Sequence, residues 1–262
     1  MEDSIIKKQL VIFCMFVLLF SGCARMYSQN TITQTSTIDA LLAGVYDGQT
    51  SCAQLLDHGN LGIGTFDHLD GEMILLDGVL YQIKSDGKVY RPDGSLTTPF
   101  AAACWFSPDE TFGLQNPVTY DGIKKILDKR FPNQNLFCAI KIHGRFKSVH
   151  TRSVPIQKKP YPPLAEVTAH QPEFNATNIS GAIVGFRCPP FVKGINVPGY
   201  HLHFLSDAKN FGGHLLGFEM EKGQCAVDVC NQFVLILPEN QETLKSVDLS
   251  KDRSKELERV EQ

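Results

Sequence analysis

The chain has 262 residues, of which 43% are hydrophobic and 20% charged, so it can bury a core as one large domain or two small ones. These proportions exclude a disordered, collagen-like or coiled-coil chain. The 25 Lys and Arg against 28 Asp and Glu give a net charge of -3, which offers no general attraction for nucleic acid. The 17 Phe, 21 Gly and 14 Pro favour strands and turns, and we expect a β-rich α+β fold.

The N-terminus has the features of an export signal. Lys7 and Lys8 precede an apolar run over residues 10–20, which is shorter than the roughly 20 residues of a membrane-spanning helix. The sequence LFSGC follows and ends at Cys23, and it resembles a bacterial lipobox, in which the Cys carries a lipid. We expect residues 1–23 to be a signal peptide with lipidation at Cys23, and the protein to be an exported, membrane-anchored lipoprotein. A secreted or periplasmic form and a cytoplasmic form are the alternatives.

The next segments predict a tether followed by short elements. Residues 24–37 are rich in Ser, Thr and Gln without an apolar pattern, which indicates a tether, and we expect folded structure to begin near Ile38. Short helices are predicted over residues 38–46 and 52–56. Apolar and β-branched runs then predict a meander of strands, with turns at the dipeptides Asp77-Gly78, Asp86-Gly87 and Asp93-Gly94.

A helix and a long strand are predicted in the middle of the chain. Apolar residues at helical spacing predict a helix over residues 120–131, with Asp121 as a candidate cap. A long strand follows over residues 136–149, and a Pro-rich, basic connection after it places a boundary near Pro160. Further strands are predicted over residues 179–187, 199–205, 214–221 and 232–237.

These elements divide the mature chain into an N-terminal domain over residues 38–160, a C-terminal domain over 161–248 and a helical tail over 249–262. The cysteines form no CxxC pair and fit no zinc-finger spacing. Cys225 and Cys230 are close enough in the chain to be bridged in an oxidising compartment, and the sequence alone leaves their state open.

The strongest candidate for chemistry is the segment PGYHLHFLSDAKNFGGHLLGF. His201 and His203 are two residues apart in a strand-like context, so their side chains leave the same face. The Gly212-Gly213 pair brings His214 onto a neighbouring strand. Three neutral imidazoles with open coordination positions are what a catalytic divalent ion such as Zn²⁺ needs. The alternative is that these are ordinary hydrogen-bonded histidines.

Two charged residues fall on predicted apolar strand faces. The alternation of the long strand, when extended, reaches His150 and Arg152, and an inward Arg needs an anionic partner such as a bound carboxylate. A β-bulge before Arg152 would instead return it to solvent. Glu72 shares its face with Ile74 and Leu76, so it is a candidate general acid or base, or a holder of metal-bound water. A solvated turn residue is the alternative for Glu72.

The segments GIGTFDHLDGEMILLDG, VHTRSVP, NVPGYHLHFLSDAKNFGGH and LERVEQ resemble the alpha-acetolactate decarboxylase family, in the same order and across nearly the whole mature chain. The resemblance implies an N-terminal mixed β-sheet with helices, a C-terminal small β-barrel that carries the metal, and a homodimer. The residues that it carries over are His201, His203 and His214 as zinc ligands, Thr65 as a substrate contact, and Arg152, Glu72 and Glu261 as catalytic residues. Glu258 is the alternative to Glu261, because the tail aligns loosely.

The implied reaction is zinc-dependent decarboxylation of 2-acetolactate, a small 2-hydroxy-3-oxo acid, to (R)-acetoin and CO2. Zinc would act as the Lewis acid for the developing oxyanion, so we expect no organic cofactor. A membrane would be contacted only through the lipid anchor. One competing hypothesis is a cupin-like metal oxygenase or isomerase, for which the acidic ligand after HxH could only be Asp207. Another is a non-enzymatic lipoprotein that binds metal or small molecules.

Overall fold

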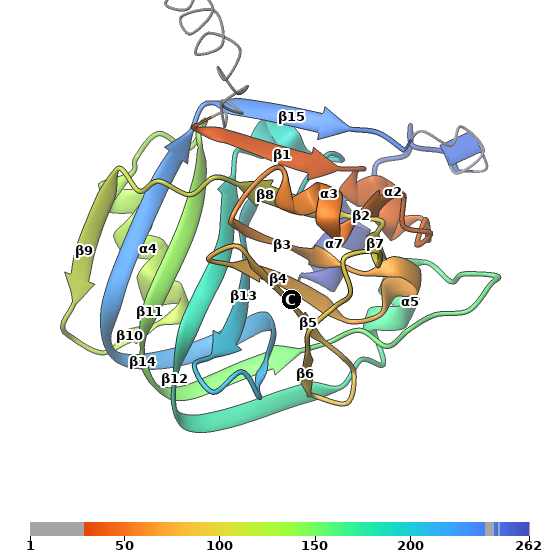
Figure 1. The fold of residues 1–262 in the computed structure, drawn as a ribbon. Helices are drawn as coiled ribbons and strands as arrows, with labels where there is room; N and C mark the ends of the chain where they lie inside the picture. Colours follow the sequence, from red (N-terminus) through yellow and green to blue (C-terminus); the bar gives the residue numbers. More distant parts are fainter. Residues whose placement is uncertain (1–28, 239–243, 246, 262) are drawn as a thin grey trace, which may run out of the picture.

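The computed structural model describes residues 29–238, 244–245 and 247–261, so the predicted signal peptide and Cys23 lie outside the described residues. Two β-sheets account for most of the fold (Figure 1). Apolar side chains from both sheets, such as Ile63 and Ala102 from one and Val184 and Phe186 from the other, form a single buried cluster. The β-rich α+β class is confirmed. No helix of the described residues is long and apolar enough to cross a membrane.

The first sheet has seven strands, which are antiparallel except for the parallel pair of β1 and β15. In spatial order they are β15 (Gln232–Ile236), β1 (Thr31–Thr35), β8 (Ala101–Cys104), β3 (Leu61–Thr65), β4 (Glu72–Leu76), β5 (Val79–Ile83) and β6 (Val89–Tyr90). All five residues of β1 are buried, so folded structure begins before the predicted Ile38. Sequence analysis missed β1 because its Thr and Gln side chains look like a tether until neighbouring strands cover them.

The second sheet has six strands, and the expected small barrel is not confirmed. Its strands are β10 (Val118–Thr119), β14 (Gly212–Cys230), β11 (Phe137–Arg152), β12 (Glu173–Cys188), β13 (Gly199–Ser206) and β9 (Glu110–Leu114), which pairs with β14. The strands β11, β12 and β14 run for 16, 16 and 19 residues and pair along most of that length. The local residue pattern predicted shorter strands. Exposed positions recur along the outer parts of β12 and β14, so these parts lack a continuous apolar pattern.

Short elements complete the fold. A third sheet has two strands, β2 (Thr50–Ser51) and β7 (Thr97–Thr98). The helices are α2 (Ile38–Leu42), α3 (Cys52–Leu56), α4 (Tyr120–Arg130), α5 (Leu164–Thr168) and α7 (Ser254–Val260), with 3₁₀ turns at Asp67–Leu69 and Pro190–Val192. The helices α2, α5 and α7 gather at one end of the molecule, far from α4 (Figure 1). Their apolar side chains, including Leu41, Leu164 and Leu257, form a third buried cluster.

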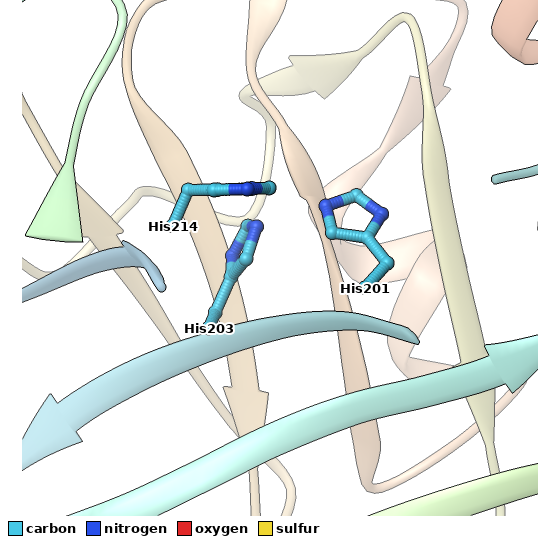
Figure 2. A group of neighbouring side chains, drawn as sticks. All are labelled: His201, His203 and His214. Carbon is cyan, nitrogen blue, oxygen red and sulfur yellow. The ribbon is translucent and has the colours of Figure 1, made fainter. Parts of the chain in front are cut away.

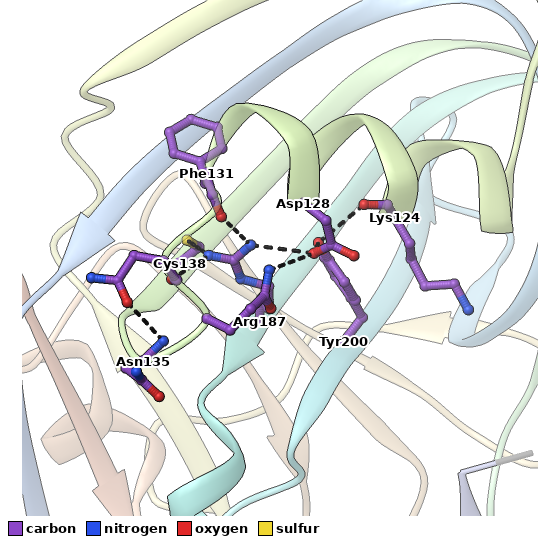
Figure 3. Close-up of polar contacts among 9 residues, drawn as sticks. Lys124, Asp128, Phe131, Asn135, Cys138, Arg187 and Tyr200 are labelled. Atoms are coloured by element: carbon purple, nitrogen blue, oxygen red, sulfur yellow. Dashed lines mark hydrogen bonds and ion pairs between the residues drawn. The ribbon is translucent and has the colours of Figure 1, made fainter.

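The helix α4 is tied to the six-stranded sheet by a buried Arg (Figure 3). The N-cap of α4 is Thr119 rather than the predicted Asp121, because the Thr119 hydroxyl accepts from an N–H in the first turn. Arg187 on β12 donates from Nη1 to Asp128 Oδ1 at 3.3 Å, and Tyr200 on β13 donates to the same oxygen at 2.7 Å. This network therefore anchors β13 at the residue before His201.

Candidate metal centre

Three imidazole rings meet where β13 pairs with the start of β14. His201 and His203 leave the same face of β13, and His203 is the direct register partner of His214 on β14. The ring centroids lie 5.0 to 5.3 Å apart, and one ligand nitrogen from each ring lies within 4.8 Å of the others. Figure 2 shows the three rings turned toward one another. The predicted convergence of the three histidines is therefore present.

The protonation state of the three rings suits metal binding. His203 Nδ1 lies 3.0 Å from the carbonyl oxygen of Met73, so Nδ1 carries the proton and Nε2 offers a lone pair. That Nε2 is buried and has no hydrogen-bond partner among the described residues. A buried polar atom without a partner is costly, and a metal ion beside His201 and His214 would satisfy it. The donor set therefore fits a divalent ion such as Zn²⁺.

Burial keeps these imidazoles neutral. Burial, and secondarily the charge of Arg152, lowers the pKa of His201 to about 3. Burial is also the main reason why the pKa values of His203 and His214 lie well below the ordinary histidine value. Neutral imidazole is the form that binds metal, so the histidines are ready as ligands throughout the neutral pH range.

Two buried carboxyl groups face the histidines. Glu72 Oε2, at the start of β4, lies 3.6 Å from His203 Nε2, and Glu261 Oε2, just after α7, lies 3.8 Å from His214 Nε2. Burial raises the pKa of each carboxyl to about 7, although the charge of Arg152 opposes the shift. These groups are therefore able to exchange a proton near neutral pH.

Glu72 lies on the apolar face, as its alternation predicted, and is not a solvated turn residue: it is 7% exposed, and Val154 N–H donates to its Oε1 at 3.3 Å. Glu261 is placed by the docking of α7, whereas the alternative residue Glu258 is exposed. Only the tertiary position of the tail separates these two candidates.

Arg152 is buried at the end of β11, where it is the register partner of His214. The pairing of β11 shifts register between His150 and Thr151, but Arg152 still points inward, so the alternative of a solvent-exposed Arg152 is wrong. His150 instead forms a half-exposed ion pair with Glu173 at 2.8 Å. Arg152 is 2% exposed and lines the same cavity as the histidines.

Thr65 also lines the cavity, at the end of β3 and directly opposite Glu72. Its hydroxyl donates to the carbonyl oxygen of Gly71 at 2.7 Å, so its proton is engaged within the turn between β3 and β4. The residue that was expected to touch the substrate therefore also holds the turn that presents Glu72.

The cavity has a volume of about 40 Å³, and α7 closes it on one side. Its apolar wall includes Leu69, Phe100 and Val154, and the tail adds Val260 and Glu261. The arrangement combines a candidate metal site, a cation and two buried carboxyl groups, with little room for bulk water. It suits a reaction on a small anionic molecule.

Other sequence candidates lie elsewhere. Asp207, the acidic ligand required by the cupin hypothesis, forms an exposed ion pair with His143 at 3.0 Å. Cys225 and Cys230 are free and belong to two different buried clusters. Sequence reasoning missed the Met73 carbonyl and Gln171, whose Oε1 accepts from Arg152 Nη1 at 2.7 Å. A backbone carbonyl carries no sequence signal, and Gln171 lies in a loop without a pattern.

Comparisons with known proteins agree with this geometry. Residues 32–251 match the family model described as alpha-acetolactate decarboxylase. A relative of that name from Methanosarcina mazei is 47% identical over 234 residues, covering 89% of this chain and 81% of the relative. One from Bacillus subtilis is 42% identical over 200 residues, covering 76% of this chain and 78% of the relative. The crystal structure of alpha-acetolactate decarboxylase from Bacillus subtilis strain 168 superposes with a TM-score of 0.86 at 38% identity, covering 88% of this chain and 99% of that one.

Proposed function

The chain belongs to the alpha-acetolactate decarboxylase family and is a carboxy-lyase, and on this premise we propose that it converts 2-acetolactate to (R)-acetoin and CO2 with zinc as its metal. The observation that carries the zinc proposal is the buried Nε2 of His203, which lacks a partner and faces His201 and His214. These three residues would hold the ion. When bound, zinc would supply a Lewis acid for the negative charge that builds up on the substrate oxygens as CO2 leaves.

Arg152 binds the substrate carboxylate in this proposal. Its guanidinium lies in the cavity wall, and its Nε has no hydrogen-bond partner among the described residues. A charge-assisted bond from a buried guanidinium orients a carboxylate more strongly than a neutral donor does. The carboxylate is thereby held beside the histidines, and the bond that breaks is presented in one orientation.

Glu72 and Glu261 hold and return the proton. Loss of CO2 leaves a carbon that must be protonated from one side to give a chiral product. Both carboxyl groups face the histidines, and both have pKa values of about 7, so each can keep a proton and release it at neutral pH. The Val154 N–H that holds Glu72 Oε1 fixes the direction from which that carboxyl acts.

The cavity wall excludes water from the reacting carbon. Phe100 and Leu69 are almost fully buried, and Val260 closes the cavity from the tail. A small, mostly apolar cavity strengthens the interaction of Arg152 with its anion, because the effective dielectric is low.

The test is a direct assay of residues 24–262. Racemic acetolactate is added, CO2 and acetoin are followed before and after chelation, chiral chromatography identifies the acetoin, and metal content is measured on the same sample. We expect about one zinc per chain and formation of (R)-acetoin that stops on chelation and returns with zinc. Zinc without acetoin would contradict the reaction, and acetoin that resists complete metal removal would contradict the role of zinc.

We further propose that the protein is exported, lipidated at Cys23 and dimeric. The apolar run that ends in LFSGC supports the first two statements, and the family resemblance supports the third. Mass spectrometry of the mature N-terminus in wild type and Cys23→Ser tests lipidation, and light scattering tests the dimer. An unmodified Met1 in the mature protein would contradict export by this route.

A further inference from the structure

Among the residues that the structure describes, the groups that accept hydrogen bonds from the Arg152 guanidinium are electrically neutral. Nη1 donates to the amide oxygen of Gln171 at 2.7 Å, and Nη2 donates to the carbonyl oxygen of Val260. Among the described residues, no carboxylate lies within ion-pair distance of Arg152, because Glu72 and Glu261 direct their Oε2 atoms at histidines instead. A buried Arg is usually paired directly with an acidic side chain, whereas Arg152 acts on Glu72 and Glu261 only through its charge, without a direct ion pair.

Gln171 is held in place independently of Arg152. It lies between α5 and β12, and its N–H donates to the carbonyl oxygen of Thr168 at 3.4 Å. The following residue, Pro172, accepts the N–H of Ser153 at 3.2 Å, so the segment lies beside the end of β11. The backbone of Gln171 is therefore placed by these contacts, and from it the side-chain amide oxygen reaches Nη1 of Arg152.

We propose that Gln171 is a positioning residue that holds Arg152 through a neutral amide, so that no direct ion pair at this position competes with the carboxylate of the substrate for the guanidinium. This inference rests on the proposed function, because it assigns the substrate carboxylate to Arg152. A Glu at position 171 would occupy nearly the same volume and keep the acceptor oxygen, but it would pair with Arg152 and compete with the substrate.

The test compares two probes that have the same shape but differ in charge. Lactate is a 2-hydroxy carboxylate and lactamide is its neutral amide. Binding of each to the zinc-loaded wild type, Gln171→Glu and Gln171→Met is measured by calorimetry, and kcat and KM are measured with acetolactate. Gln224→Glu, at an exposed position on β14, adds the same charge away from the cavity and serves as the control.

We expect Gln171→Glu to weaken lactate binding by about tenfold and to leave lactamide binding unchanged, with KM rising more than kcat falls. Gln171→Met loses the acceptor but adds no charge, so we expect it to keep the preference for lactate and to lose mainly kcat. Gln224→Glu should resemble wild type. Melting temperature and zinc content show whether each variant is folded.

Lactate binding by Gln171→Glu at the wild-type level would overturn the proposal, because a purely structural amide is replaced well by a carboxylate. Equal losses of lactate binding in Gln171→Glu and Gln171→Met, or no preference for lactate in wild type, would also overturn it. A wild type that binds lactate in the expected pattern but forms no acetoin would contradict the proposed reaction alone.

Discussion

At the scale of single residues, the site is built from groups that are buried without their usual partners. His203 Nε2 and Arg152 Nε have no hydrogen-bond partners among the described residues, and both belong to side chains that line the cavity. Burial at the same time raises the pKa values of Glu72 and Glu261 to about 7. Burying such groups costs free energy unless a ligand offsets it. These residues therefore indicate a binding site more clearly than burial alone does.

Arg152→Ala should keep zinc and lose turnover. The substitution removes the cation from the cavity but none of the histidines, so we expect stoichiometric zinc and a fall in kcat/KM of about 100-fold or more. Arg145→Ala is the control, since Arg145 lies on the same strand in an exposed ion pair with Glu221. Near wild-type turnover in Arg152→Ala would contradict the role of Arg152.

At the scale of elements, strand pairing places the histidines and a docked helix completes the cavity. Gly185 on β12 lies opposite the β13 backbone, and a Cβ at this position would lie 2.1 Å from the carbonyl oxygen of His201. The C-terminal helix α7 contributes through Leu257 and Val260, which pack against α2 and α5. The site therefore depends on two separate contacts, the pairing of β12 with β13 and the packing of α7 against α2 and α5.

Gly185→Ala should disrupt the metal site although Gly185 is not one of the candidate ligands. The added methyl group must push β13 away, which displaces His201, so we expect a lower melting temperature and weaker zinc binding. Gly217→Ala on β14 is the matched control, because a Cβ there meets nothing within 4 Å. The idea fails if the two variants bind zinc equally well.

Leu257→Ala should loosen α7. Truncation of this buried Leu should cost about 2–4 kcal/mol of packing, which is enough to undock a short helix and to withdraw Glu261 from the cavity. We expect faster hydrogen exchange in α7 and a lower kcat, while Glu258→Ala, at an exposed position in the same helix, should resemble wild type. Unchanged exchange in Leu257→Ala would show that other contacts hold the tail.

At the scale of the whole molecule, long strands join the two sheets. After β14 ends at Cys230, the chain turns at Asn231 and enters β15 beside β1, so it leaves the six-stranded sheet and completes the seven-stranded one. Near this crossing Asp228 is 1% exposed, and one of its oxygens accepts the N–H of Ser107 at 2.8 Å, while the other has no partner among the described residues. Burial raises the pKa of Asp228.

This shift predicts a pH-dependent gain in stability for Asp228→Asn. A carboxyl with a raised pKa in the folded state binds its proton more tightly than in the unfolded state, so it costs stability as pH rises through the window above its ordinary value. Asn keeps the acceptor for Ser107 and removes the charge. We expect the gain in free energy of unfolding relative to wild type to be larger at neutral than at acidic pH, as measured by denaturant titration. A pH-independent difference would contradict this account.

Local features of the protein and most residues of its candidate site could be predicted from the sequence. The two-residue spacing of His201 and His203, the apolar face shared by Glu72 and the helix at 52–56 all follow from side-chain periodicity and turn chemistry, which act within a few residues. The motifs also identified the family, whose model matches residues 32–251.

The pairing of distant segments could not be predicted from the sequence and is visible only in the folded chain. The strand β1 looks like a tether until β8 and β15 cover it, and the long strands form a six-stranded sheet where a small barrel was expected. Three further contacts join residues more than ten positions apart. Glu261, rather than Glu258, lies beside His214, the Met73 carbonyl lies beside His203, and the Gln171 amide accepts from Arg152. Such contacts are set by packing between elements, and a local pattern of residues carries no information about that packing.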